Sequence, residues 1–153
     1  MLIYIASSFR NLHAVQMLSA ALTARGHTVF DWTVLAPPLE DSLSPEARRM
    51  ALDADERGEI FAFCAQACRT ADVLIYLGTA GQDAACEVGM AFASGVPILG
   101  LAAPTEKPGV ILARAVQWCK NVPELLQMVE QAYDLGILSH NSCLAAARLR
   151  GVG

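Results

Sequence analysis

The stretch TADVLIYLGTAGQDAACEVGMAFASGVPILGL, residues 70–101, decides the fold. It holds two short apolar runs, 72–78 and 96–101, separated by a helix's length of mostly small residues. Short continuous apolar runs are typical of strands buried on both faces of a parallel sheet, and parallel strands need a crossover between them. The stretch therefore predicts a buried strand, a crossover helix and a second buried strand, with Gly78 and Gly81 permitting the turn between strand and helix.

The same alternation continues on both sides of this unit, and it predicts one α/β domain with right-handed crossovers. Five strands favour a flavodoxin-like or Rossmann-like parallel sheet in the order 2-1-3-4-5, with helices on both faces and ligands at the carboxyl ends of the strands. We expect this domain over residues 1–136 and a tail, in which a helical turn or two is compatible with the sequence, over 137–153. The other expected strands are 2–6, 27–32 and a weak 116–119, and the expected helices are 11–26, 44–52, about 55–69, 107–115 and 122–136.

Composition limits the class of protein. The chain has 153 residues, enough for one domain, with 54% apolar and only 17% charged residues. A double-sided buried sheet, with a subunit interface as a second source, accounts for this apolar excess. The net charge of −4 argues against a nucleic-acid polymer as partner. No apolar run reaches the roughly 18 residues of a membrane span, and we expect neither a signal peptide nor a membrane partner, which predicts a cytoplasmic protein.

The cysteines indicate reduced thiols. There are five of them, an odd count, and none forms a CxxC pair. This usage fits a reducing compartment better than a disulfide framework. Cys64 and Cys68 lie one helical turn apart, but no histidine is near in sequence, so we favour packing over a metal site. The sequence predicts no metal and no cofactor.

Glu87 is the most distinctive residue of the quoted stretch. We expect Asp83 to cap a helix that begins at Ala84, which places Glu87 at the fourth helical position, free of capping duty. The helix dipole favours an ionised carboxylate there, and its neighbours are small enough to admit a ligand. Such a carboxylate suits covalent glycosyl chemistry. The alternative is an ordinary acidic residue near a helix start, which the pattern alone favours.

The loop SSFRN, residues 7–11, is the second distinctive segment. Ser7 and Ser8 offer hydroxyls, Arg10 offers a guanidinium, and a helix start offers backbone N–H groups; together these suit a phosphate or another oxyanion. The alternative is that Ser8 or Asn11 simply caps the helix and that Arg10 is solvated. Neither GxGxxG nor GxxxxGK[ST] occurs, so no dinucleotide fingerprint or P-loop is present.

Three segments carry a family resemblance: IYIASSFRN at 3–11, TADVLIYLG at 70–78 and CEVGMAFASGVPILGL at 86–101. They resemble the nucleoside 2-deoxyribosyltransferase-like family, which includes the deoxynucleoside 5′-monophosphate N-glycosidases. The most specific part is E-x-G-x-A-x-x-x-G-x-P, which begins at Glu87. The resemblance covers roughly residues 2–101.

This resemblance implies an enzyme that cleaves the N-glycosidic bond of a nucleoside or nucleoside 5′-monophosphate, by hydrolysis or base transfer. It implies that Glu87 is the nucleophile, that Tyr4 sets the glutamate, and that Ser8 and Arg10 contact a 5′-phosphate. Trp32 either stacks on the base or packs against the helical layer. Relatives of this kind form homodimers or larger homo-oligomers, and the loop 102–109 is placed to contact a neighbouring subunit.

The chain departs from the family at two positions. Cys64 stands where the family has an aspartate involved in substrate handling or acid catalysis, and Gly81 stands where it has an aspartate or a serine. Asp83, two residues further on, is an alternative source of that carboxylate. The second hypothesis is therefore a nucleotide-binding or sensing module with weakened or lost catalysis. A third is an N-glycosidase for NAD-like or modified nucleotides, with Asp83 and Glu87 as its carboxylate pair.

Overall fold

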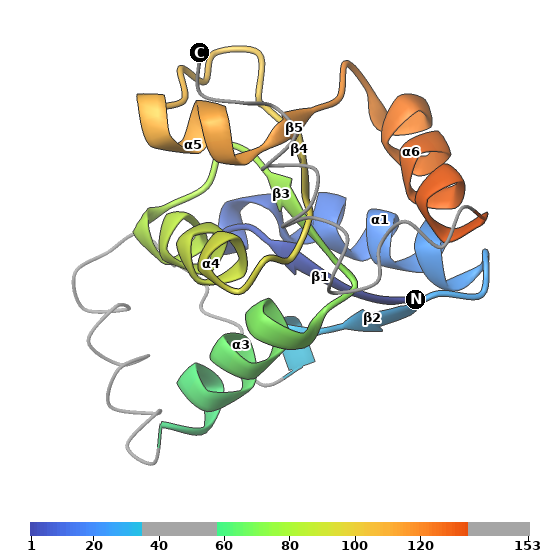
Figure 1. Ribbon diagram of the computed structural model, residues 1–153, viewed down its shortest axis with the longest axis horizontal. Helices are drawn as coiled ribbons and strands as arrows, with labels where there is room; N and C mark the ends of the chain where they lie inside the picture. Colours follow the sequence, from blue (N-terminus) through green and yellow to red (C-terminus); the bar gives the residue numbers. More distant parts are fainter. Residues whose placement is uncertain (35–57, 135–153) are drawn as a thin grey trace.

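Five short strands form one sheet in the order β2-β1-β3-β4-β5, and every neighbouring pair is parallel, in the computed structural model (Figure 1). The structure describes residues 1–34 and 58–134. The order confirms the flavodoxin-like topology that the alternation of strands and helices predicted. The strands are β1 (Leu2–Ala6), β2 (Thr28–Phe30), β3 (Val73–Leu77), β4 (Ile98–Leu101) and β5 (Gln117–Trp118).

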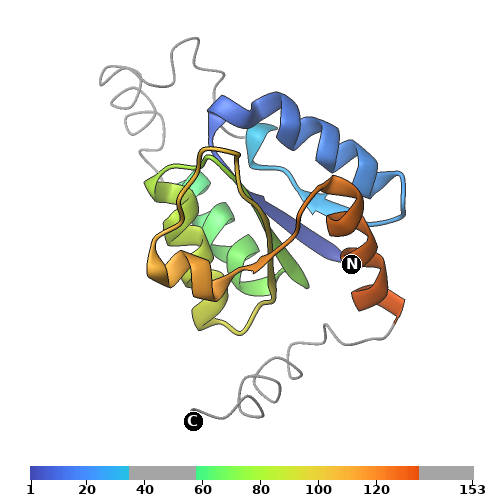
Figure 2. The same cartoon turned by 90° about the horizontal axis from the view of Figure 1, so that it is seen from above.

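Helices cover both faces of the sheet. In Figure 2, α1 and α6 lie on one side of it and α3, α4 and α5 on the other. None of the helices described is long and apolar enough to cross a membrane. The helices are α1 (Leu12–Thr23), α3 (Glu59–Thr70), α4 (Gln82–Ala93), α5 (Val110–Ala115) and α6 (Val122–Asp134), with short 3-10 turns η1 (Phe9–Asn11) and η2 (Trp32–Val34).

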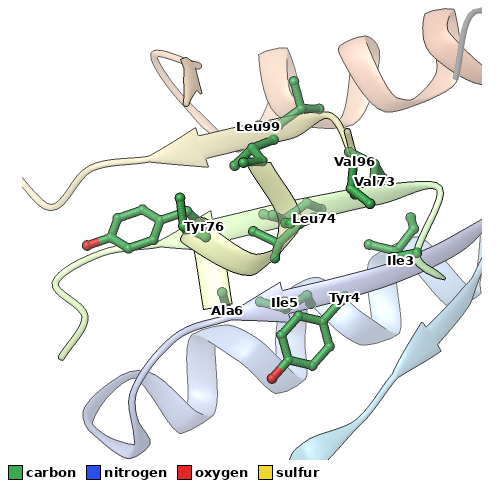
Figure 3. Packing of buried hydrophobic residues seen from close by; sticks show 14 of the residues in the cluster. Ile3, Tyr4, Ile5, Ala6, Val73, Leu74, Tyr76, Val96 and Leu99 are labelled. Carbon is green, nitrogen blue, oxygen red and sulfur yellow. The ribbon is translucent and has the colours of Figure 1, made fainter. Parts of the chain in front are cut away.

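The register of the strands decides which side chains share a face. Tyr4 pairs with Leu74 and Ala6 pairs with Tyr76, so both tyrosines project from the same face of the sheet, since residues two apart in a strand point the same way. That face is the one covered by α3 and α4, both of which contact β1. Figure 3 shows the rings of Tyr4 and Tyr76 with their hydroxyls pointing in different directions.

The two central strands are buried throughout their length, apart from their ends. From Ile3 to Ala6 in β1, and from Val73 to Tyr76 in β3, no residue exposes more than 2% of its surface. This burial on two faces is what the continuous apolar runs predicted, and it accounts for much of the unusual apolar content.

Strand β2 is shorter than the expected 27–32, and Asp31 is the reason. The side chain of Asp31 accepts hydrogen bonds from the backbone N–H of Thr33 at 2.9 Å and from its hydroxyl at 2.5 Å. This local turn ends the strand at Phe30 and carries Trp32 into η2. The expected helix at 44–52, the first residues of the helix expected from about 55, and the tail 137–153 lie outside the described residues.

Helix α4 begins two residues earlier than expected, which corrects the role given to Asp83. Gly81 is the N-cap, in an extended conformation with φ −91° and ψ −165°, and its carbonyl accepts from the N–H of Ala85 at 3.3 Å. Asp83 therefore lies inside the first turn instead of capping the helix. Glu87 is consequently further from the helix start than the fourth helical position we expected, and the effect of the helix dipole on it is weaker.

Candidate active site

Glu87 and Tyr4 come from α4 and β1 and meet in the layer between helix and sheet. The hydroxyl of Tyr4 donates a hydrogen bond of 2.6 Å to Oε1 of Glu87. Tyr4 is fully buried and Glu87 is only 9% exposed. Burial of a carboxylate is costly unless hydrogen-bond donors meet it. Glu87 is therefore not an ordinary solvated acidic residue near a helix start.

The environment of Glu87 disfavours its charge. Burial raises the pKa of Glu87 from 4.5 to about 7, helped by the negative charge of Asp83; the hydrogen bonds from Tyr4 and Cys64 act in the opposite direction. The pKa of Tyr4 is also raised, mainly by burial and next by the adjacent Glu87 carboxylate. Tyr4 therefore stays protonated and acts as a hydrogen-bond donor to Glu87. A carboxylate with a pKa near neutrality is typical of active sites.

Cys64 lies on α3, the helix that packs beside α4 and β1. Its side chain is partly buried, and it contributes to lowering the pKa of Glu87. Cys68, one turn further along α3, is fully buried in the core, and burial raises the pKa of its thiol. The packing that we favoured for the two cysteines thus describes both: Cys68 lies in the core, and Cys64 is partly buried and packs against it.

Asp83 and Gly81 lie at the start of α4 and are both exposed. Asp83 is one helical turn before Glu87, close enough for its charge to raise the pKa of that carboxyl. A side chain at Gly81 would meet no neighbouring atom within 4 Å, so the position is open. Both residues therefore lie at the exposed start of the helix that carries Glu87.

The side chains of the loop after β1 are tied to the loop after β3. Ser7 donates to the carbonyl of Leu77 at 2.8 Å, and Ser8 lies 3.5 Å from the carbonyl of Thr79. The amide of Asn11 donates to the carbonyl of Thr79 at 3.0 Å and to the hydroxyl of Ser7 at 3.1 Å. Neither Ser8 nor Asn11 makes the side-chain cap that was the alternative interpretation of this loop. These bonds hold the two loops of the switch point against each other.

Arg10 and Trp32 differ in their exposure to solvent. Arg10 is exposed in η1 and makes no ion pair with any residue that the structure describes. Trp32 is 7% exposed; its indole N–H donates to the carbonyl of Ile5 at 2.8 Å, and its ring meets that of Phe9 edge-to-face. The packed alternative for Trp32 therefore describes this structure, and a base-stacking role would require the ring to move.

A second tyrosine–carboxylate pair was missed by the sequence reasoning. Tyr76 donates a short hydrogen bond to Oε1 of Glu106, whose Oε2 accepts from the N–H of Ala103 at 3.1 Å. Glu106 lies in the loop 102–109 and packs on Gly78, where a Cβ would stand 1.8 Å from Oε2. The only signal in the sequence was the placement of this acid after β4. Through this contact, Glu106 ties its part of the loop to β3.

Metal chemistry finds no support in the residues described. Among residues 1–34 and 58–134, no three His, Cys, Asp or Glu side chains come together as a metal site would require. The polar groups around Glu87 instead are one phenol, one thiol and one exposed carboxylate. This donor set suits hydrogen bonding to a carboxylate and to an organic substrate.

Comparison with solved structures identifies the fold. The CMP N-glycosidase BcmB of Clostridium botulinum superposes with a TM-score of 0.57 at 16% identity, covering 85% of this chain and 99% of that one. A 2-deoxyribosyltransferase of Bacillus psychrosaccharolyticus gives a TM-score of 0.55 at 20% identity, covering 79% of this chain and 87% of that one. The chain has the fold of the nucleoside 2-deoxyribosyltransferase-like proteins. At these identities the likeness establishes the fold alone.

The likeness agrees with the resemblance that the sequence motifs carried, because both lead to N-glycosidases and deoxyribosyltransferases. No model of a known protein family matches the chain, and no curated protein matches it by sequence. The fold expected from the motifs is confirmed. The roles expected for individual site residues stay predictions.

Proposed function

We propose that this chain is an enzyme that cleaves the N-glycosidic bond of a nucleoside or nucleoside 5′-monophosphate, with Glu87 as nucleophile. The observation that carries the proposal is the 2.6 Å hydrogen bond between the Tyr4 hydroxyl and the buried Glu87 carboxylate, on a fold shared with two enzymes of N-glycosidic chemistry. Glu87 begins the motif E-x-G-x-A-x-x-x-G-x-P that first indicated this chemistry. The motif and the buried hydrogen bond both support Glu87 as the nucleophile.

The reaction follows from what an ionised carboxylate does. An oxygen of Glu87 attacks C1′ of the sugar, the bond from C1′ to the base nitrogen breaks, and the base leaves with that electron pair and takes up a proton. Water then attacks C1′, which breaks the ester and restores the carboxylate; in base transfer, a second base replaces the water. Tyr4 keeps its proton throughout and holds Oε1, so that the other oxygen is directed to the sugar.

In this proposal, the loop after β1 binds the 5′ end of the substrate. Arg10 is exposed and Ser8 is partly exposed, with its hydroxyl 3.5 Å from the carbonyl of Thr79, whereas the hydroxyl of Ser7 donates to the carbonyl of Leu77 at 2.8 Å. An exposed guanidinium near the carboxyl edge of the sheet favours a phosphorylated substrate over a free nucleoside. We therefore expect Arg10→Gln to raise KM for a monophosphate and to leave KM for the free nucleoside unchanged.

The decisive experiment is a turnover assay. Purified protein is incubated with ribo- and deoxyribonucleoside 5′-monophosphates and with the free nucleosides, with and without a second base, and released base is measured by chromatography. Release by the wild type and none by Glu87→Ala supports the proposal. Nucleotide binding without release from any substrate supports the second candidate, a sensing module. What favours that candidate is the burial of Glu87, which keeps much of it protonated near neutral pH.

Homo-oligomerisation and a cytoplasmic location also remain proposals. The neighbouring helices α4 and α5 expose large apolar side chains, namely Phe92, Val110 and Ile111. Adjacent exposed apolar residues on a protein of this size fit a subunit interface. Light scattering coupled to size-exclusion chromatography measures the mass directly, and a monomer at micromolar concentration would contradict this part of the proposal.

A further inference from the structure

The two residues of the buried pair belong to chain segments that meet again at the edge of the sheet. Strand β1, which carries Tyr4, ends at Ala6 and continues into the turn 7–11. Helix α4, which carries Glu87, follows the loop 78–81 after β3. A bond between this turn and this loop therefore helps to hold the Tyr4 hydroxyl at 2.6 Å from Oε1 of Glu87.

The side-chain amide of Asn11 makes such a bond. Its Nδ2 lies 3.0 Å from the carbonyl oxygen of Thr79, 3.1 Å from Oγ of Ser7 and 3.3 Å from the carbonyl oxygen of Leu77. A carbonyl oxygen only accepts, and Ser7 already donates its hydroxyl proton to Leu77 at 2.8 Å, so it accepts from Asn11. All three neighbours thus require a donor, and the two protons of the NH₂ group supply it.

The loop 78–81 is held from two sides. The N–H of Gly78 donates to the carbonyl of Leu101 at 2.9 Å, which fixes the start of the loop to β4. Thr79 follows, and its carbonyl accepts from Asn11 two residues before the N-cap of α4. The Asn11 amide therefore acts on the part of the loop that leads directly into the helix.

We propose that Asn11 is a positioning residue for Glu87: its amide ties the loop before α4 to the turn after β1, and this fixes the carboxylate relative to Tyr4. Asn11 acts through the backbone of the loop and not on the substrate. The consequence for turnover rests on the proposed function, whereas the tie between the two segments does not.

A change from asparagine to aspartate tests this role sharply, because an ionised aspartate has the same shape but only accepts hydrogen bonds. Asn11→Asp places an acceptor where three acceptors meet, so the tie is replaced by repulsion. Asn121→Asp is the matched control with the same change in charge. Oδ1 of Asn121 accepts from the N–H of Glu124 at 2.9 Å at the start of α6, and aspartate keeps that role. Asn11→Ala removes the donor without adding a charge.

The first measurement is amide hydrogen exchange by NMR, on proteins whose fold is verified by circular dichroism. The N–H groups of Gly78 and Ala85 report on the two ends of the loop 78–81 through their hydrogen bonds. The N–H of Leu74, in the buried part of β3, reports any general loss of stability. Relative to Leu74, we expect exchange at the two loop positions to become about tenfold faster or more in Asn11→Asp, and faster by a smaller factor in Asn11→Ala.

Faster exchange at both ends of the loop in the Asn11 variants, with Asn121→Asp at wild-type rates, supports the proposal. An equal acceleration at Leu74 indicates general destabilisation and overturns it. Exchange in a folded Asn11 variant that stays within about twofold of wild type overturns it as well. If Asn11→Asp does not fold, Asn11→Ala decides the matter.

Turnover then separates this inference from the function it rests on. If the wild type releases base, kcat of Asn11→Asp falls about 10–100-fold on nucleosides and monophosphates alike, because a misplacement of about 1 Å at the nucleophile has an effect of that size. A loss confined to KM for monophosphates overturns the positioning role, since Asn11 then serves the 5′ end through its neighbour Arg10.

The two failures remain distinguishable. If exchange changes as expected but the wild type releases no base, the tie between the two segments stands and the proposed reaction fails. If base is released and the folded Asn11 variants keep the wild-type kcat, the reaction stands and the positioning role fails.

Discussion

Two tyrosines project from the same face of the sheet, and each is hydrogen-bonded to a glutamate in a different environment. Tyr4 and Tyr76 lie on the adjacent strands β1 and β3, and each donates its hydroxyl proton to a glutamate. Glu87 stands on a helix at 9% exposure, whereas Glu106 stands in a loop and is half-buried. The second oxygen of Glu106 accepts a hydrogen bond from the backbone N–H of Ala103.

The two pairs differ in the burial of the carboxylate and in its consequence. The hydrogen bond from Tyr4 lowers the pKa of Glu87, but burial raises it more, so the net pKa is about 7. The rim pair, Tyr76 and Glu106, instead ties the loop after β4 to the end of β3 over Gly78. The buried pair thus has a carboxyl with a raised pKa, whereas the rim pair ties a loop to a strand. Each prediction below breaks one of the two pairs, and two of them use the other pair as a control.

The largest expected effect is on turnover. Glu87→Gln keeps the shape of the side chain but removes the nucleophile, so we expect kcat/KM for base release to fall by at least about 10³-fold. Glu106→Gln changes the matched glutamate of the rim pair and is expected to leave kcat/KM within about threefold. Steady-state kinetics on the best substrate of the panel measures both. Equal losses in the two variants would contradict the assignment of the nucleophile.

The next effect is on stability, and its sign follows from the raised pKa. Between pH 4.5 and about 7 the folded protein keeps a proton on Glu87 that the unfolded chain has lost, so stability falls as pH rises through this window. Glu87→Gln removes that penalty. Relative to wild type it gains up to about 3 kcal/mol of unfolding free energy above pH 7 and nothing extra below pH 4.5. Urea denaturation at pH 4.5 and pH 8 tests this, and a gain that is equal at both pH values would refute it.

Removing the phenol of the buried pair has an intermediate effect. Tyr4→Phe deletes the hydrogen bond that lowers the pKa of Glu87, so we expect that pKa, and the acid limb of the kcat/KM profile, to rise by about one unit. Activity at pH 6 then falls about tenfold while activity at pH 9 falls less. Tyr76→Phe is the control, because its hydroxyl bonds Glu106 and not Glu87. A pH profile shifted by Tyr76→Phe as well would mean that the two pairs are coupled.

The fold was predictable because it depends on patterns that repeat along the chain. The apolar runs of β1, β3 and β4 and the spacing of the helices between them were sufficient to give the strand order. Boundaries were less predictable, since they depend on single contacts. Strand β2 stops early because Asp31 bonds Thr33, and α4 starts early because Gly81, not Asp83, takes the extended conformation of an N-cap.

The site was predictable only in part, for a physical reason. Glu87 and Tyr4 were identified from a family resemblance, and the structure brings them within 2.6 Å. Their burial, and hence the raised pKa of Glu87, depends on how α3 and α4 pack on the sheet, which no local pattern records. The pairing of Tyr76 with Glu106 joins residues 30 positions apart through a loop of irregular conformation. Such a contact leaves no periodic trace in the sequence.

The smallest effect is expected at the rim. Tyr76→Phe and Glu106→Gln each weaken one partly exposed hydrogen bond, so each lowers the unfolding free energy by about 1 kcal/mol. The double variant costs less than the sum of the two, because the singles remove the same bond. Urea denaturation of the four proteins in this cycle at one pH measures the coupling. Strict additivity would show that the bond contributes nothing, and that the loop 102–109 is held by the packing of Glu106 on Gly78 instead.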